Sequence, residues 1–161
     1  MSLDPDRLQG LADFRRALRK FLAASEAISK AGGVTQQQYQ ALLALRSWQG
    51  PPMTVGDLAR ELLLTHHGAV QLVDRLALAG YMARTASGDD RRKVELGLTD
   101  AGRQTLDALA ELHLTEILRQ EPQLAQSLRK LRKASTLGER QTNSFTPKAD
   151  VPKVGKEFSR S

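Results

Sequence analysis

Residues 64–103 read LTHHGAVQLVDRLALAGYMARTASGDDRRKVELGLTDAGR, and this stretch decides the fold. In its first half, apolar residues recur at helical spacing until Gly80 ends the pattern, and Thr65 stands where a helix N-cap is expected. These features predict a helix that buries one stripe against the rest of the chain. The stripe consists of Ala69, Leu72, Val73 and Leu76.

The second half of the stretch predicts a β-hairpin. A strand is expected over 81–86, a turn over 87–91 and a returning strand over 94–98, where residues alternate with period two. The tip of the hairpin, residues 89–93, carries two acids followed by three bases, DDRRK. A bare solvated turn needs only glycine and polar residues, so these cations indicate a turn that contacts something.

Two more helices are predicted before this stretch. Thr35 and Gln38 form a capping-box pattern at the start of one helix, which Gly50-Pro51-Pro52 ends. Thr54 opens a short helix with Asp57 in its first turn, where the helix dipole favours an anion. Two consecutive short helices, each opened by threonine, are typical of a helix-turn-helix, and a hairpin directly after them is a wing.

A long helix is predicted at the N-terminus. Asp4-Pro5 supplies an N-cap acceptor followed by proline, and Gly32-Gly33 stops the helix after Ala31. Its seam has heptad-like spacing and requires a partner helix, either from the same chain or from a second copy. The seam residues are Leu11, Phe14, Leu18, Phe21, Ser25 and Ile28.

Further helices are predicted after the hairpin. Thr99 caps a helix that Glu121-Pro122 is expected to break, and a last helix follows. We expect residues 137–161 to be a disordered tail, because they are polar, contain proline and show little apolar periodicity. The apolar positions of the first of these helices stay on one face, at Leu106, Leu109, His113 and Ile117, and the last helix carries Leu124, Leu128 and Leu131.

The composition narrows the class of protein. The chain of 161 residues has room for one domain, and since it has no cysteine, disulfides, thiolate metal sites and thiol redox sensing are excluded. No apolar run reaches the roughly 20 residues of a membrane span and the N-terminus carries acids, so we expect a soluble cytoplasmic protein. A net charge of +6 and an isoelectric point near 10.0 favour a polyanionic partner.

From about Thr54 to Arg103 the chain resembles regulators of the MarR type. The similar features are VDRL inside the second helix of the motif, the wing sequence Asp90-Arg91-Arg92, and an LT-x-x-G motif at Leu98, Thr99 and Gly102. They occur in one order with compatible spacing, and the helices on either side follow the same order as in the family.

The resemblance implies a mainly α fold with a small β wing, in which a winged helix-turn-helix module over about 35–99 is flanked by dimerisation helices over about 4–31 and 99–136. The MarR-like domain would then span 1–136. It also implies a homodimer that binds double-stranded DNA at a palindromic operator as a repressor, and that responds to a small aromatic or anionic effector. No cofactor is expected.

The exposed face of the second helix supplies candidate DNA contacts. Residues of that face near the helix N-terminus usually reach base edges in a helix-turn-helix. Gln71 can bind adenine through two hydrogen bonds, Val70 can contact a thymine methyl, and His67 can donate to guanine or phosphate. The alternative is an ordinary solvated helix face. The helix candidates are Thr65, His66, His67, Val70, Gln71 and Arg75.

The wing supplies a second set of contacts. Arg92 can enter a minor groove, whose negative potential attracts guanidinium, and Asp90 can hold Arg92 in place by a charge-assisted hydrogen bond. Arg91 and Lys93 would contact phosphates. The alternative is a solvated, salt-bridged loop.

The sequence gives weaker support for a metal site and for an effector site than for the DNA contacts. His66-His67, with Asp89, Asp90 or His113, does not have a metal-ligand spacing, because adjacent helical residues diverge by about 100°. His113 is better explained as a hydrogen-bonded interface residue. Candidate effector contacts are Arg15, Tyr39, Trp48 and His66, which are polar or aromatic and near the junction of module and flanking helices.

No nucleophile constellation or phosphate-binding glycine loop occurs, so an enzyme is not expected. The alternative to a DNA-binding regulator is a protein-interaction module that uses the winged fold to dock a partner without reading DNA. The arginines of the wing favour DNA, since such a module has little use for DRRK at the hairpin tip.

Overall fold

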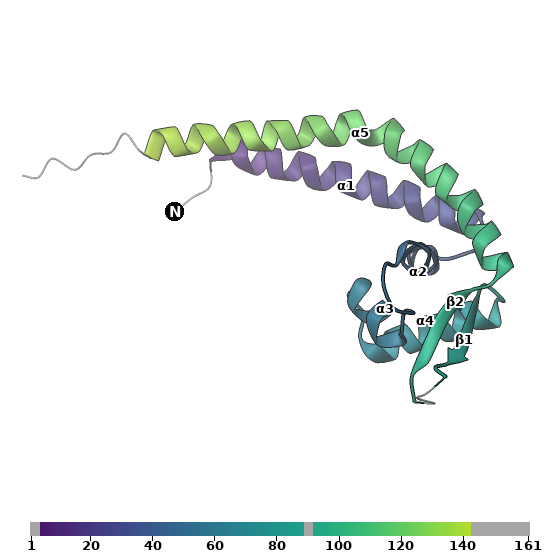
Figure 1. Cartoon of the computed structure of the whole chain (residues 1–161). Coiled ribbons are helices and arrows are strands. Elements are labelled where there is room, and N and C mark those ends of the chain that lie inside the picture. Colours follow the sequence, from purple (N-terminus) through teal and green to yellow (C-terminus); the bar gives the residue numbers. More distant parts are fainter. Residues whose placement is uncertain (1–3, 89–91, 143–161) are drawn as a thin grey trace, which may run out of the picture.

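The structure is a computed structural model that describes residues 4–88 and 92–142, and it is mainly helical with one small sheet (Figure 1). Two long helices lie side by side as an arm, and the remaining elements form a module at one end of it. In chain order the elements are α1 (Pro5–Ala31), α2 (Gln36–Ser47), α3 (Val55–Glu61), α4 (His66–Leu78), β1 (Met82–Ala86), β2 (Val94–Leu98) and α5 (Asp100–Thr142).

Threonine begins α2 to α5, as the sequence predicts. Thr35 Oγ1 accepts from the Gln38 amide at 3.1 Å, and Gln38 Oε1 accepts from the Thr35 amide at 2.9 Å, which completes the capping box. Equivalent threonine caps begin the later helices at Thr54, Thr65 and Thr99.

The start of α1 corrects one prediction. The Asp4 side chain makes no capping hydrogen bond, although Pro5 stands at the first helical position. The first turn is closed instead by the backbone, where the Arg7 amide donates to the Asp4 carbonyl at 3.0 Å. Proline therefore starts this helix through its fixed φ and not through a side-chain cap.

The core of the module lies between the helix-turn-helix, the wing and the first turns of α5. The predicted stripe of α4 is confirmed, because Ala69, Leu72, Val73 and Leu76 are all buried. Other elements complete this core with Leu42, Met53, Leu58, Met82, Leu96, Leu106 and Leu109.

The wing is a two-stranded antiparallel sheet whose register runs from Met82 opposite Leu98 to Ala86 opposite Val94. It is fastened to the start of α3, since the Leu96 amide donates to the Met53 carbonyl at 2.8 Å and Thr54 forms a β-bridge with Glu95. Of the turn predicted over 87–91, residues 89–91 lie outside the described part of the chain.

The arm corrects the prediction that Glu121-Pro122 breaks the last helix. α5 continues through Pro122 to Thr142, past the expected boundary at 136, and Figure 1 shows one helix that bends. Contacts with α1 offset the hydrogen bond that proline removes, because Gln120 and Ser127 on either side of it are buried. Residues 143–161 lie outside the described part. No helix in the described ranges combines the length and apolar character of a membrane span.

We expect Gly102→Ala to destabilise the protein by about 1 to 3 kcal/mol, because a Cβ at residue 102 would lie 2.0 Å from the Tyr81 carbonyl oxygen. Urea unfolding followed by circular dichroism measures this. Gly97→Ala is the matched control, since its Cβ would meet nothing within 4 Å. Equal stability losses for the two variants would contradict the close contact.

Candidate nucleic-acid interface

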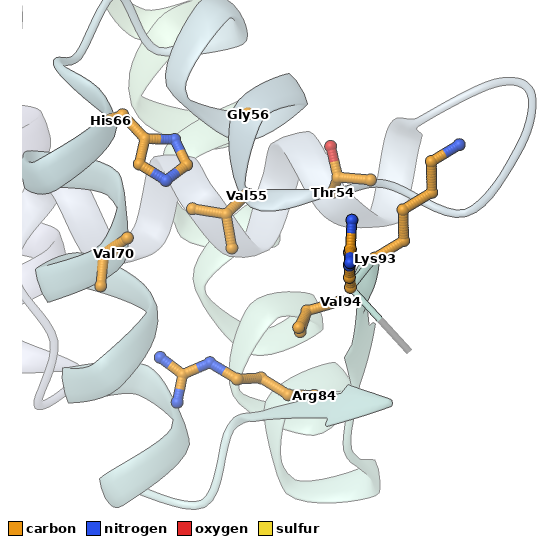
Figure 2. Close-up of a pocket in the computed structure, with 9 residues that line it drawn as sticks. Thr54, Val55, Gly56, His66, Val70, Arg84, Lys93 and Val94 are labelled. Carbon is orange, nitrogen blue, oxygen red and sulfur yellow. The ribbon is translucent and has the colours of Figure 1, made fainter. Parts of the chain in front are cut away.

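One open hollow of about 500 Å³ lies between the helix-turn-helix and the wing (Figure 2). Its floor is apolar, with Val55 from α3, Val70 from α4 and Val94 from β2, and cationic side chains stand on the wing side. The hollow brings three separate segments to one surface. Its remaining lining residues are Thr54, Gly56, His66, Arg84, Arg92 and Lys93.

The outward face of α4 presents most of the predicted base contacts. Thr65 caps this helix by accepting from the Gly68 amide at 3.0 Å. His67 and Gln71 lie one turn apart with Nε2 atoms 3.1 Å from each other, so each restricts the other's rotamer. His66, His67, Gln71 and Arg75 are exposed and Val70 is half-buried.

The start of α3 is held by a second reciprocal cap. The Asp57 carboxylate accepts from the Thr54 amide at 2.9 Å and from the Thr54 hydroxyl at 2.8 Å, and it also pairs with Arg60. The hydrogen bonds from Thr54 have the largest effect and hold the pKa of Asp57 below its ordinary value. Burial raises the pKa by less than these bonds lower it, and the Arg60 charge and hydrogen bond lower it further. The sequence predicts Asp57 in the first turn because the helix dipole favours an anion there. It does not by itself predict the capping box.

An ion pair that sequence reasoning missed joins α4 to the wing. Arg84 on β1 donates to the carboxylate of Asp74 on α4, and Figure 2 shows Arg84 extending toward α4. Both side chains are partly exposed, so the pair adds little to stability, and its effect is to align the two elements. The sequence feature that could have predicted this ion pair is an acid on the outward face of α4 followed by a base on the next strand.

The wing brings Arg92 and Lys93 to the same hollow as Arg84, and both are exposed. Three cationic side chains therefore line the hollow beside α4. Asp89, Asp90 and Arg91 lie outside the described residues, so the orienting role of Asp90 and the phosphate contact of Arg91 stay predictions.

The four predicted effector contacts lie in different surroundings. Arg15 is exposed on α1, and Tyr39 is buried with its ring stacked on His113. Trp48 donates from Nε1 to the Pro51 carbonyl at 2.8 Å and lines a hollow beside β2. His66 instead lines the hollow between α4 and the wing. Trp48 and His66 therefore line different hollows.

The histidines likewise occupy separate sites. His66 and His67 are on the exposed face of α4, whereas His113 is buried within the chain and bonded to backbone carbonyls. Among residues 4–88 and 92–142, no group of three or more histidines and acids is placed to hold a metal ion.

Comparison with known proteins adds to this geometry. Residues 32–93 match the MarR family. The transcriptional activatory protein BadR of Rhodopseudomonas palustris is 35% identical over 83 residues, which are 51% of this chain and 47% of BadR. The match thus spans about half of that relative's length.

Two solved structures share the fold. AbsC, a MarR family transcriptional regulator from Streptomyces coelicolor, gives a TM-score of 0.70 at 22% identity over 89% of this chain and 99% of AbsC. The transcriptional repressor CouR, bound to a 23-mer DNA duplex, gives 0.59 at 27% identity over 81% and 89%. All three matched proteins are transcriptional regulators and not enzymes, in agreement with the prediction for this chain.

We expect Asp57→Asn to lower the free energy of unfolding by about 0.5 to 1 kcal/mol at neutral pH. Because the folded-state pKa of Asp57 is lowered, its contribution is present above the pKa of the unfolded chain, about 4, and is lost as pH falls through the folded value. Urea titrations from neutral pH downward should therefore show the two proteins converging. Asp107→Asn, on the exposed side of α5, is the control, and a constant difference at all pH values would contradict the role of the charge.

Proposed function

We propose that this chain, which belongs to the MarR family of transcriptional regulators, is a homodimeric repressor that binds a palindromic DNA operator and that a small aromatic or anionic ligand releases. The observation that carries the proposal is the surface on which the outward face of α4 and the cations of the wing stand together. The proposed DNA contacts are Thr65, His66, His67, Val70, Gln71, Arg75, Asp90, Arg91, Arg92 and Lys93.

The two sets of contacts have different tasks. α4 has a polar outward face that suits the major groove, where Gln71 and His67 can read base edges. Arg92 and Lys93 on the wing suit the adjacent minor groove and the phosphates. The Asp74–Arg84 pair aligns helix and wing, so that both can engage the duplex at once.

The arm supports the dimer part of the proposal. α1 and α5 pack against each other, yet large apolar side chains remain exposed along both, Leu118 with 63% of its surface and Leu112 with 55%. Such a surface is typical of a protein interface. A second copy of the arm would cover these residues, which also include Leu8, Leu11, Leu22, Leu114, Ile117 and Leu128.

Repression is the simplest outcome of operator occupancy, and CouR is itself a repressor, although BadR is an activator. Release by a ligand fits a chain without cysteine, because thiol oxidation is excluded. The candidate ligand contacts remain Arg15, Tyr39, Trp48 and His66, of which Trp48 and His66 already line hollows.

Selection of bound oligonucleotides from a random pool, at stated salt, tests the proposal. We expect an enriched palindrome whose half-sites lie about 10 bp apart, one turn of DNA. A pool that shows no enrichment while the protein is folded would favour the alternative of a protein-interaction module.

We expect Arg92→Ala to weaken operator binding by about 1 to 3 kcal/mol and to reduce any preference for A·T-rich flanks. Asp90→Ala should also weaken binding, although it removes a negative charge, because it leaves Arg92 without its orienting partner. Fluorescence anisotropy at several salt concentrations measures both. Arg129→Ala, on α5, is the control for loss of an exposed cation, and tighter binding by Asp90→Ala would contradict the orienting role.

We expect Leu118→Glu to convert the dimer to a monomer at micromolar concentration, because it buries a charge in the proposed interface. Sedimentation velocity measures the mass. Leu78→Glu is the control, since this leucine is 92% exposed on α4, away from the arm. A wild-type protein that sediments as a monomer, yet still binds its operator, would rule out the proposed dimer.

A further inference from the structure

Two adjoining hollows lie in the groove between α1 and α5, the helices that run side by side as the arm in Figure 1. Their volumes are about 180 Å³ and about 310 Å³, and they share Lys20 of α1 and Gln123 of α5. We call the two hollows together the arm trough. Within the described ranges, the lining of the arm trough includes none of the four candidate effector contacts, so it is a separate feature of the chain.

Cations of both helices face the arm trough. The smaller hollow is lined by Arg16 and Lys20 of α1 and by Lys130 of α5. The larger hollow is lined by Lys20 again and by Arg119 of α5. Helices that pack along a groove usually place opposite charges across it, where the charges pair. Here both sides present positive charge, and the repulsion opposes the packing of the arm unless an anion lies between the helices.

Each arginine of the arm trough pairs with an acid on its own helix. Asp13 accepts from Arg16 Nη1 at 2.9 Å, and Glu116 accepts from Arg119 Nε at 2.8 Å. The hydrogen bonds from Arg119, and then from Gln120, hold the pKa of Glu116 at about 2, so this carboxylate is ionised at neutral pH. The two acids therefore fix the positions of both guanidinium groups.

The two lysines differ from the arginines in this respect. Among residues 4–88 and 92–142, no carboxylate forms an ion pair with Lys20 or Lys130. Their side chains come from different helices and line the same hollow. An ammonium group carries a full charge and three N–H donors, so two of them at one hollow favour a bound oxyanion.

The residues of the arm trough favour phosphate over a carboxylate. A phosphate group carries up to two negative charges on three acceptor oxygens, so it can contact Lys20, Lys130 and Arg16 together. The Gln123 amide adds N–H donors beside them. The larger hollow, joined to the first at Lys20, offers a second position beside Arg119. Two phosphate positions that share one lysine suit a diphosphate group.

The ends of the arm trough favour a small molecule over a nucleic-acid backbone. Because α1 and α5 run in opposite directions, Asp13 and Glu116 stand toward opposite ends of the cationic stretch. A long chain of phosphates that followed the groove would pass a carboxylate at each end, which costs binding energy. A diphosphate group is short enough to lie between the two acids.

The arm trough lies on a different side of the arm from the exposed leucines. At about 100° per residue, Leu11 and Leu22 of α1 stand opposite Lys20 around that helix. Leu128 of α5 likewise stands opposite Lys130. A second copy of the arm that covers these leucines would leave the arm trough open to a ligand.

We propose that the arm trough binds the diphosphate group of a small molecule. Lys20 contacts both phosphates, Lys130 and Arg16 contact one of them, and Arg119 contacts the other. The bound anion joins α1 to α5 across a groove of like charge, and it stabilises the arm because it binds only the folded chain. This site depends on the arm alone and not on the proposed binding of DNA.

Isothermal titration calorimetry of the full chain with inorganic pyrophosphate, in buffer without divalent metal, tests the site. We expect saturable binding of one pyrophosphate per chain. Orthophosphate should bind about tenfold or more weakly, because it fills only one of the two positions. Lys20→Gln should weaken pyrophosphate binding by about tenfold or more, since it removes the cation common to both positions.

Arg19→Gln is the matched control for Lys20→Gln. Arg19 is the neighbouring residue on α1 and is also exposed, and its loss changes the net charge equally, but it does not line the arm trough. On α5, Arg129→Gln serves Lys130→Gln in the same way. Circular dichroism confirms that each variant is folded. No saturable binding, or equal losses for Lys20→Gln and Arg19→Gln, would overturn the proposal.

Duplex DNA without an operator separates a diphosphate site from a general polyanion surface. We expect Lys20→Gln and Arg19→Gln to bind such a duplex equally at each salt concentration. If Lys20→Gln instead loses affinity for the duplex and keeps it for pyrophosphate, the arm trough binds nucleic acid and the proposal is wrong. Absence of an enriched operator would refute the proposed function and leave the pyrophosphate result unaffected.

A second measurement needs no ligand. Lys20→Gln should raise the urea midpoint in low-salt buffer, because it removes one of the like charges across the groove, whereas Arg19→Gln should not. Pyrophosphate should raise the midpoint of the wild-type protein and have little effect on Lys20→Gln. A Lys20→Gln midpoint below that of the wild type would contradict the like-charge argument from which the site is inferred.

Discussion

The contact at Thr99 fixes how the winged module is joined to the arm. Thr99 donates from its hydroxyl to the Gly80 carbonyl at 2.6 Å and from its amide to the Tyr81 carbonyl at 3.2 Å, and it caps α5 at Gly102. Because Gly102 has no side chain, the first turn of α5 lies directly against Tyr81. This contact sets the direction in which α5 leaves the wing.

Because α5 is continuous, this one helix contributes to three parts of the structure. Its first turns supply Leu106 and Leu109 to the core of the module, its next turn places His113 at the junction, and the remainder packs on α1. One continuous helix therefore connects the core of the module to the arm.

Much of the fold could be predicted from the sequence because it depends on near neighbours. The threonine caps at Thr35, Thr54 and Thr65 and the buried stripe of α4 are set by residues within one or two turns. The effect of Pro122 could not be predicted in this way. Its local cost is offset by packing against α1, which lies far away in the sequence.

The candidate nucleic-acid interface also depends in part on contacts between residues far apart in the sequence. Helical period placed Gln71 and Val70 on the outward face of α4, but the pairing of Asp74 with Arg84 depends on how the hairpin folds back. Tyr39 is a predicted ligand contact because it is aromatic and close to the junction, but its stack on His113 depends on how α2 and α5 pack, which the sequence does not show.

Hydroxyl-radical footprinting on the selected operator tests the central claim most directly. The account predicts two protected minor-groove segments, symmetric about the operator centre, where the two wings lie. A single protected segment, or uniform protection along the duplex, would contradict a dimer that reads DNA through paired winged modules.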